Sequence, residues 1–178
     1  MKKKLYMLML TIVMVVCVCG CKKEKKEETT DTKNVLKEDI VEFVNTELPA
    51  IKDKRDTAIG IYNSYFSSES KDLKTFLSDL NTKALPGMEE YITELSAIEV
   101  ATSEVSNLKD LYLQSSRKQY EAMVLVVSAI EGENPNYLSQ ADSLIAESEA
   151  LLIQFDSQLK LLSSENNITI NGSFLPAN

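Results

Sequence analysis

The chain has 178 residues, with 19 basic and 27 acidic side chains, no histidine, and a net charge of −8. All three cysteines lie within the first 21 residues, so nothing after Cys21 supplies a thiol for a disulfide, a redox pair or a metal site. These absences exclude the common nucleophile–base pairs and the usual zinc sites, and the acidic balance disfavours nucleic acid as a partner.

Residues 1–20 are predicted to be a signal peptide. Three lysines, Lys2 to Lys4, precede an apolar run from Leu5 to Val18 that only Thr11 interrupts. A membrane-spanning helix needs about 20 apolar residues, so this run is too short to anchor the chain by itself.

The signal ends in Val18-Cys19-Gly20-Cys21, which resembles the lipobox of bacterial lipoproteins. In that pattern an aliphatic residue at −3 and Gly or Ala at −1 precede the modified cysteine, and Cys19 is an unusual occupant of −2. The resemblance implies cleavage before Cys21, attachment of a diacylglycerol with acyl chains such as palmitate, and anchorage in a membrane. An ordinary secretory signal that is cut elsewhere is the alternative.

Residues 21–34 are predicted to be the lipidated cysteine and a disordered tether. The stretch from Lys22 to Asn34 contains no apolar residue and has nothing to bury. As a flexible chain it would reach about 20 Å from the membrane anchor.

A helical domain is predicted over residues 35–178, with eleven basic and 23 acidic residues. Its first apolar stripe runs at helical spacing from Leu36 to Tyr65, with a kink expected at Pro49. Ser70 is predicted to cap the next helix. The apolar stripe of that helix reaches Ala84, and Pro86-Gly87 then interrupts the pattern.

One long helix is predicted from Met88 to Glu131, with a length of about 65 Å. Tyr91, Ile98, Val105 and Tyr112 recur at a seven-residue step, which is typical of helices that pack lengthwise.

Gly132 is predicted to cap that helix, and Asn134-Pro135 to start the last one. Ile168, Ile170, Phe174 and Leu175 then predict a tail that lies extended in a helix groove. The predicted fold is therefore all-α: an elongated antiparallel bundle of three long helices, the second broken or kinked near Pro86, with an extended C-terminal tail.

No catalytic, metal-binding or cofactor-binding residue is predicted. Glu90 with Glu94, and Asp53 with Asp56, share helix faces and could form carboxylate pairs for acid–base chemistry, but solvated surface is the favoured interpretation. Four tyrosines and two arginines could instead line a ligand or partner groove, although such tyrosines more often close the edge of a core: Tyr62, Tyr65, Tyr91, Tyr112, Arg55 and Arg117.

The N-terminal 34 residues look like those of small lipoproteins from Gram-positive bacteria. The segments ELPAIKDKRDTAIGIYNSYF and NPNYLSQADSLIAESEALL are similar in style to the all-helical domains that such lipoproteins carry. This resemblance implies a lipid anchor on the extracytoplasmic face of the cell membrane. The leading hypothesis is a non-enzymatic interaction or scaffold module with a basic envelope protein as its partner. The alternatives are a lipoprotein that binds a small amphipathic or cationic ligand between helices, and an inhibitor or chaperone of an exported enzyme.

Overall fold

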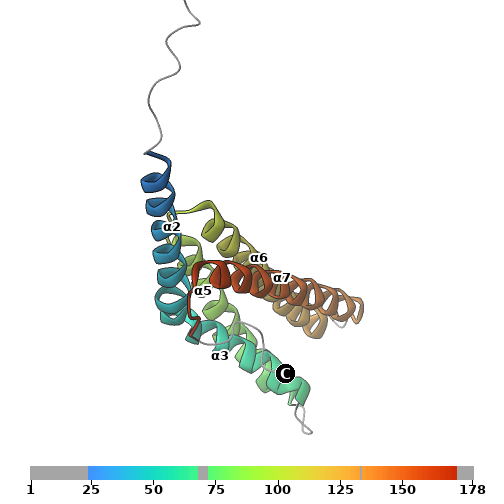
Figure 1. The fold of residues 1–178 in the computed structure, drawn as a ribbon. Helices are drawn as coiled ribbons and strands as arrows, with labels where there is room; N and C mark the ends of the chain where they lie inside the picture. The colour runs from blue at the N-terminus through green and yellow to red at the C-terminus, as the bar shows by residue number, and fades with distance from the viewer. Residues whose placement is uncertain (1–23, 68–71, 133, 172–178) are drawn as a thin grey trace, which may run out of the picture. The chain divides into compact units, whose positions relative to one another are not determined.

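The computed structural model describes residues 24–67, 72–132 and 134–171 (Figure 1). Backbone contacts divide the chain into two compact units, Met1–Lys33 and Asn34–Asn178, and the packing described below lies within the second. Every regular element among the described residues is helical, so the all-α prediction is confirmed for them.

The first helical segment runs from Glu24 to Ser67 without a break. It comprises α2 (Glu24–Glu42), the π-helical turn η1 (Phe43–Glu47) and α3 (Leu48–Ser67). Pro49 has no N–H, so the carbonyl four residues earlier loses its usual helical partner. The wider turn just before the proline, closed by the Leu48 N–H donating to the Phe43 carbonyl, lets the helix continue through this position.

The N-terminal part of α2 differs from the disordered tether that was predicted for residues 22–34. The backbone is helical from Glu24 onward. Glutamate and lysine both favour helix, and neither glycine nor proline interrupts this stretch. The lack of apolar side chains therefore did not determine the backbone conformation.

The second helical segment comprises α4 (Leu73–Asp79), η2 (Leu80–Ala84) and α5 (Leu85–Ala97). Its N-cap is Asp72, whose carboxylate accepts the backbone N–H groups of Lys74 at 3.1 Å and Thr75 at 3.3 Å. Ser70, the predicted cap, lies outside the described residues.

The second helix was predicted to be broken or kinked near Pro86, and it is not broken there. The helix passes through Pro86-Gly87, and η2 ends two residues before this proline just as η1 ends two residues before Pro49. Each π-helical turn lies where the missing proline N–H would otherwise interrupt the α-helical ladder.

Residues 98–102 are not helical and separate two helices. The single helix predicted from Met88 to Glu131 was therefore wrong. Thr102 has extended backbone angles, and its hydroxyl accepts the Val105 N–H at the start of α6 (Ser103–Glu131). Asp39 of α2 accepts the N–H groups of Ala101 at 2.9 Å and Thr102 at 2.8 Å. Lys109 donates to the carbonyls of Ser96 and Ile98 at the end of α5. Contacts that are remote in sequence thus stabilise both helix ends at this elbow.

The described residues therefore form four helical segments rather than three long helices. The last is α7 (Asn136–Asn166), joined to α6 by a short turn. Gly132 caps α6 as predicted, and the Asn134 side chain accepts the Asn136 N–H at 3.2 Å at the start of α7. At the other end of α7, Asn167 adopts the left-handed conformation that commonly ends helices.

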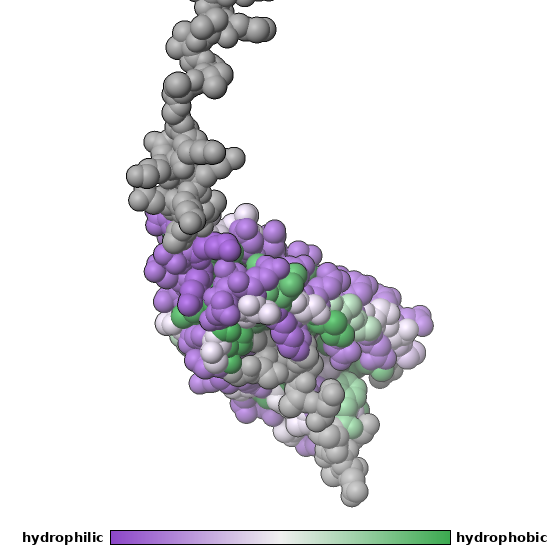
Figure 2. Space-filling model, viewed as in Figure 1, coloured by the Kyte–Doolittle hydropathy of each residue, from purple (hydrophilic) through white to green (hydrophobic). Residues whose placement is uncertain are grey.

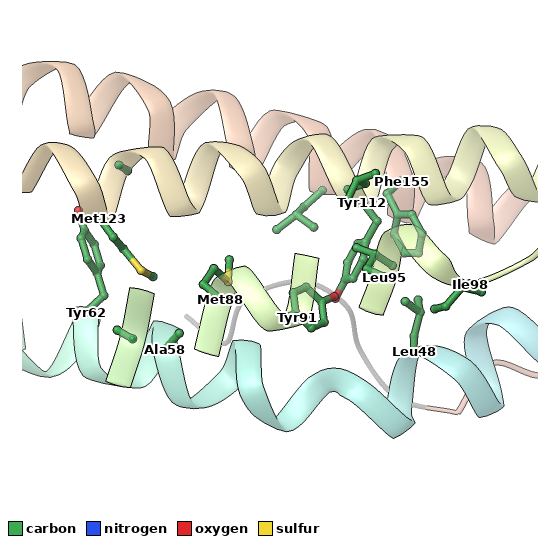
Figure 3. Packing of buried hydrophobic residues seen from close by; sticks show 14 of the residues in the cluster. Leu48, Ala58, Tyr62, Met88, Tyr91, Leu95, Ile98, Tyr112, Met123 and Phe155 are labelled. Carbon is green, nitrogen blue, oxygen red and sulfur yellow. The ribbon is translucent and has the colours of Figure 1, made fainter. Parts of the chain in front are cut away.

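The core lies between helices that contact one another in the order α3, α5, α6 and α7 (Figure 1). Figure 3 shows Tyr91 and Leu95 of α5 between Leu48 of α3 and Tyr112 of α6. The predicted seven-residue series Tyr91, Ile98, Val105 and Tyr112 is buried throughout, although Tyr91 lies in α5, Ile98 in the elbow, and Val105 and Tyr112 in α6. Each large apolar side chain buried here stabilises the fold by about 1.5–3 kcal/mol.

The tail after α7 packs against the helices through Ile168 and Ile170, which are half-buried beside the core. The Asn45 side chain in η1 donates to the Thr169 carbonyl at 3.1 Å and accepts the Asn171 N–H at 2.9 Å. Phe174 and Leu175, the other predicted tail contacts, lie outside the described residues.

Candidate functional site

The six candidate groove residues separate into different environments. Arg55, Tyr91 and Tyr112 come together in the interior where α3, α5 and α6 meet. Tyr62 and Tyr65 lie at the far end of α3, and Arg117 is exposed on α6. The structure therefore does not join all six in one groove. Cys21, the predicted lipidation site, lies outside the described residues.

The interior group is built around Arg55, whose side chain is on the buried stripe of α3 and is 8% exposed. Its Nε donates to Oε1 of Gln119 on α6 at 3.2 Å. Its guanidinium carbon lies 5.6 Å from the centre of the Tyr112 ring, a cation–π distance. Asp56 is the nearby carboxylate, 3.8 Å from Nη1 and largely exposed. The cation is thus held mainly by a neutral amide and an aromatic face.

Tyr91 of α5 completes this group. Burial raises the pKa of the Tyr91 hydroxyl well above its ordinary value, and its proximity to Tyr112 adds to the shift. Ser116 of α6 hydrogen-bonds with Tyr91 and donates to the Tyr112 carbonyl at 2.9 Å. Both tyrosines are almost fully enclosed, at 1% and 4% exposure. Their hydroxyls therefore serve contacts between helices in this structure.

A second polar contact lies between α6 and α7. The hydroxyls of Ser115 and Ser148 are 2.8 Å apart, and both residues are buried. Small hydroxyl side chains that satisfy each other allow two helices to approach closely without leaving an unpaired polar atom.

An aromatic cluster lies where α3 ends and α4 begins. Tyr65 stacks on Phe76 with ring centres 4.1 Å apart, and Phe66 meets Tyr65, Tyr62 and Phe76 at 5.1–6.3 Å. Phe66 is 51% exposed and Leu73, at the start of α4, is 48% exposed. Burial and then the charge of Asp142 raise the pKa of Tyr62. At this end of α3 and α4, an apolar surface is exposed to solvent and rests on packed aromatic rings.

The two carboxylate pairs are each bridged by a lysine. Lys54 on α3 contacts Glu90 at 2.9 Å and also Glu94. The hydrogen bond to Glu94 contributes most to raising the pKa of Lys54, and the hydrogen bond to Glu90 adds to it. Lys52 contacts Asp53 at 3.7 Å and Asp56 at 2.7 Å. These contacts join α3 to α5 and reinforce the surface of α3, which is the solvated-surface role that the sequence favoured.

Comparison with known proteins identifies the family. A family model described as EMYY-motif containing lipoprotein matches residues 1–152. The chain belongs to this lipoprotein family. The match begins at the first residue and ends within α7, so it spans the predicted signal peptide, Cys21 and the interior Arg55–Tyr91–Tyr112 group.

No curated protein and no solved structure matches the lipoprotein. Among the described residues of the lipoprotein, no helix is both long and apolar enough to cross a bilayer. The same part of the chain has no group of three or more acidic, histidine or cysteine side chains placed to hold a metal ion.

Sequence reasoning missed two features of the lipoprotein. Gln119 stands seven residues after Tyr112, where the series would continue with an apolar residue, and it is the buried acceptor of Arg55. The partner role could have been inferred from an arginine on one apolar stripe and a glutamine on another, since a buried charge requires an acceptor. The exposed aromatic end had a sequence signal as well, because Tyr65-Phe66 directly precedes the predicted helix end.

Proposed function

We propose that this lipoprotein is a non-enzymatic protein-interaction module held on the extracytoplasmic face of the cell membrane by lipid on Cys21. The family match and the Val18-Cys19-Gly20-Cys21 segment support the anchor. Two acyl chains, at about 0.8 kcal/mol for each buried methylene, would hold the chain on the bilayer stably.

The observation that carries the interaction role is the apolar surface at the α3–α4 end. Phe66 and Leu73 are each about half exposed, and Phe66 rests on a packed aromatic cluster. Aromatic side chains fixed in one orientation lose little entropy on binding, and they are common at the centres of protein interfaces. An exposed pair on a rigid base is therefore suited to docking.

The chemistry of the interior supports binding over catalysis. Arg55, Tyr91 and Tyr112 are buried and bonded to neighbouring helices, so they stabilise the packing of α3, α5 and α6. The charge of the domain supports a basic partner, because residues 35–178 carry eleven basic and 23 acidic side chains. Association of such a pair slows as salt screens the attraction.

A pull-down from solubilised envelope tests this proposal. The full lipidated chain serves as bait and is compared with a Phe66→Ser/Leu73→Ser variant and with Val35→Ser, a control that removes a similarly exposed apolar side chain from α2. We expect one partner that the double variant loses and the control retains, with binding that weakens at high salt. Equal capture by all three baits would refute the role of this surface. Turnover of an envelope substrate, abolished by one carboxylate substitution, would refute the non-enzymatic role.

A further inference from the structure

Helix α7 has an outward face without charge. Its inward face carries Ala141, Ser148, Leu152, Phe155, Leu159 and Ser163, all buried. The other side of the helix carries a stripe of eight exposed, uncharged residues, flanked by charged ones: Ser139, Ser143, Ala146, Ala150, Ile153, Ser157, Leu161 and Ser164. We call these eight residues the outward face of α7.

This face differs from the exposed sides of the neighbouring helices. The exposed positions of α3 include Lys52, Asp53 and Asp56, and those of α6 include Arg117 and Glu121. On α7, Ile153 and Leu161 are each 59% exposed, more than any other large apolar side chain among the described residues. Single exposed apolar residues need no explanation, but two on one uncharged stripe indicate a contact surface.

Figure 2 shows apolar and weakly polar atoms between hydrophilic ones on the side of the molecule that α7 crosses in Figure 1. Each of the eight residues of the outward face is exposed, so a partner could contact them.

The spacing along the face fits a second helix. The steps from Ser139 to Ser157 are four, three, four, three and four residues, the alternation of a coiled-coil seam. Small residues at Ser143, Ala146 and Ala150 let another helix approach closely, and Ile153 supplies a large apolar contact beside them.

The borders of the face are acidic. Asp142, Glu149 and Asp156 follow one border at seven-residue steps, and Glu147, which pairs with Lys118 of α6, lies on the other. Lys160 is the single basic residue of α7, and it pairs with Asp156 at 2.6 Å. A second copy of this chain would place acidic borders against acidic borders. Charge complementarity therefore favours a helix whose own borders are lysine and arginine.

We infer that the outward face of α7 binds an amphipathic helix of a partner protein, with an apolar seam on the outward face and basic residues against Asp142 and Glu149. This inference rests on the proposed function, since it assigns a partner chemistry to an interaction module. It uses a different surface from Phe66 and Leu73.

Two synthetic helical peptides test the inference. Both carry the same leucine and isoleucine seam over about three heptads, and one has lysine and the other glutamate at the border positions. Each is titrated by fluorescence anisotropy against the full lipidated chain in mild detergent, with detergent alone as the blank. The chain is used as wild type and as Ile153→Glu, Leu161→Glu, Ile153→Ser and Val124→Glu. Val124 is 37% exposed on α6 and provides a matched change from apolar to acidic.

The substitutions to glutamate distinguish an apolar contact from electrostatic attraction alone, because added negative charge would strengthen the binding of a basic peptide that depended on charge only. We expect the lysine peptide to bind wild type and Val124→Glu with the same affinity. It should bind Ile153→Glu and Leu161→Glu at least tenfold more weakly, and it should also lose affinity for Ile153→Ser. The glutamate peptide should not bind. Circular dichroism checks that each variant remains helical, and Ile153→Ser gives the answer without a new charge.

Three results would overturn the inference. The first is no binding of the lysine peptide to wild type. The second is binding to Ile153→Glu that equals or exceeds binding to wild type, because charge alone would then explain it. The third is a dimer of the chain that Ile153→Glu dissociates without any peptide binding, which would assign the face to a second copy. If the inference fails while the Phe66→Ser/Leu73→Ser bait still loses its partner, the proposed function stands on the α3–α4 end.

Discussion

The buried contact between Arg55 and Gln119 predicts a specific pattern of stability in a double-mutant cycle. In Gln119→Leu, the guanidinium keeps its place over Tyr112 but Nε loses its 3.2 Å acceptor in a site where the side chain is 8% exposed. An unsatisfied buried donor costs about 1–3 kcal/mol, and a charged one lies toward the upper end of that range. We therefore expect a loss of about 2–3 kcal/mol, equivalent to a fall in Tm of about 5–10 °C for a domain of this size.

The second single variant and the double variant complete the cycle. Arg55→Met should also destabilise, because it leaves the Gln119 amide oxygen without its donor and removes the contact with Tyr112. Arg55→Met combined with Gln119→Leu replaces both polar groups by apolar ones of similar length, and we expect its stability to lie within about 1 kcal/mol of wild type.

Urea unfolding of the full chain in detergent, followed by circular dichroism at the helical band, measures these differences. Gln114→Leu on the exposed side of α6 is the matched control, with an expected change within about 0.5 kcal/mol. The reasoning would be refuted if Gln119→Leu behaved like that control, or if the double variant lost the full sum of the two single losses.

Three further predictions concern the elbow, the interior tyrosine and the anchor. Asp39→Ala removes the acceptor of two backbone N–H groups at the elbow, and we expect it to cost about 2–3 kcal/mol in urea unfolding; a change below about 0.5 kcal/mol would show that the elbow does not depend on this carboxylate. Because the pKa of Tyr91 is higher in the folded than in the unfolded state, its contribution is fully present below the ordinary tyrosine pKa, and stability should fall by about 1.4 kcal/mol per pH unit above about pH 10. Tyr91→Phe should show a shallower fall, and an unchanged slope would argue against the raised pKa. Cys21→Ala should leave the precursor uncut or release the domain from the membrane fraction, whereas processed, membrane-bound protein that still carries lipid would show that another residue is the anchor.

The sequence predicted which residues form the core better than it predicted where helices end. Apolar stripes correctly indicated that Val105, and residues of the first stripe such as Phe43, are buried, because burial follows directly from helical periodicity. Proline and glycine suggested a break at Pro86, but a π-helical turn absorbs the lost hydrogen bond locally. The local signal near residues 98–102 was limited to Thr102 as an N-cap and Glu104 in the first turn of α6, and the elbow also depends on Asp39, about sixty positions away in the chain.

The candidate site was predictable in composition but not in arrangement. Tyrosine spacing placed Tyr91 and Tyr112 on helix stripes, yet an amphipathic ring at such a position can face either the edge or the centre of a core. Their burial depends on Arg55 and Gln119, which lie on different helices, so only the assembled fold determines it. The residues of the outward face of α7 are also visible in the sequence. Their role as an exposed surface could be recognised only once the structure showed which side of the helix packs inward.

Site-specific photo-crosslinking of the lipidated chain in its own membrane tests the central claim, that this lipoprotein acts by binding another protein, most directly. A photoreactive amino acid replaces Phe66 or Ile153 on the two apolar surfaces, and Asp53 or Glu121 at exposed charged positions of α3 and α6. The account predicts discrete protein adducts from Phe66 and Ile153 that are absent from the two charged positions. No adduct at any position, or the same diffuse products at all four, would contradict it.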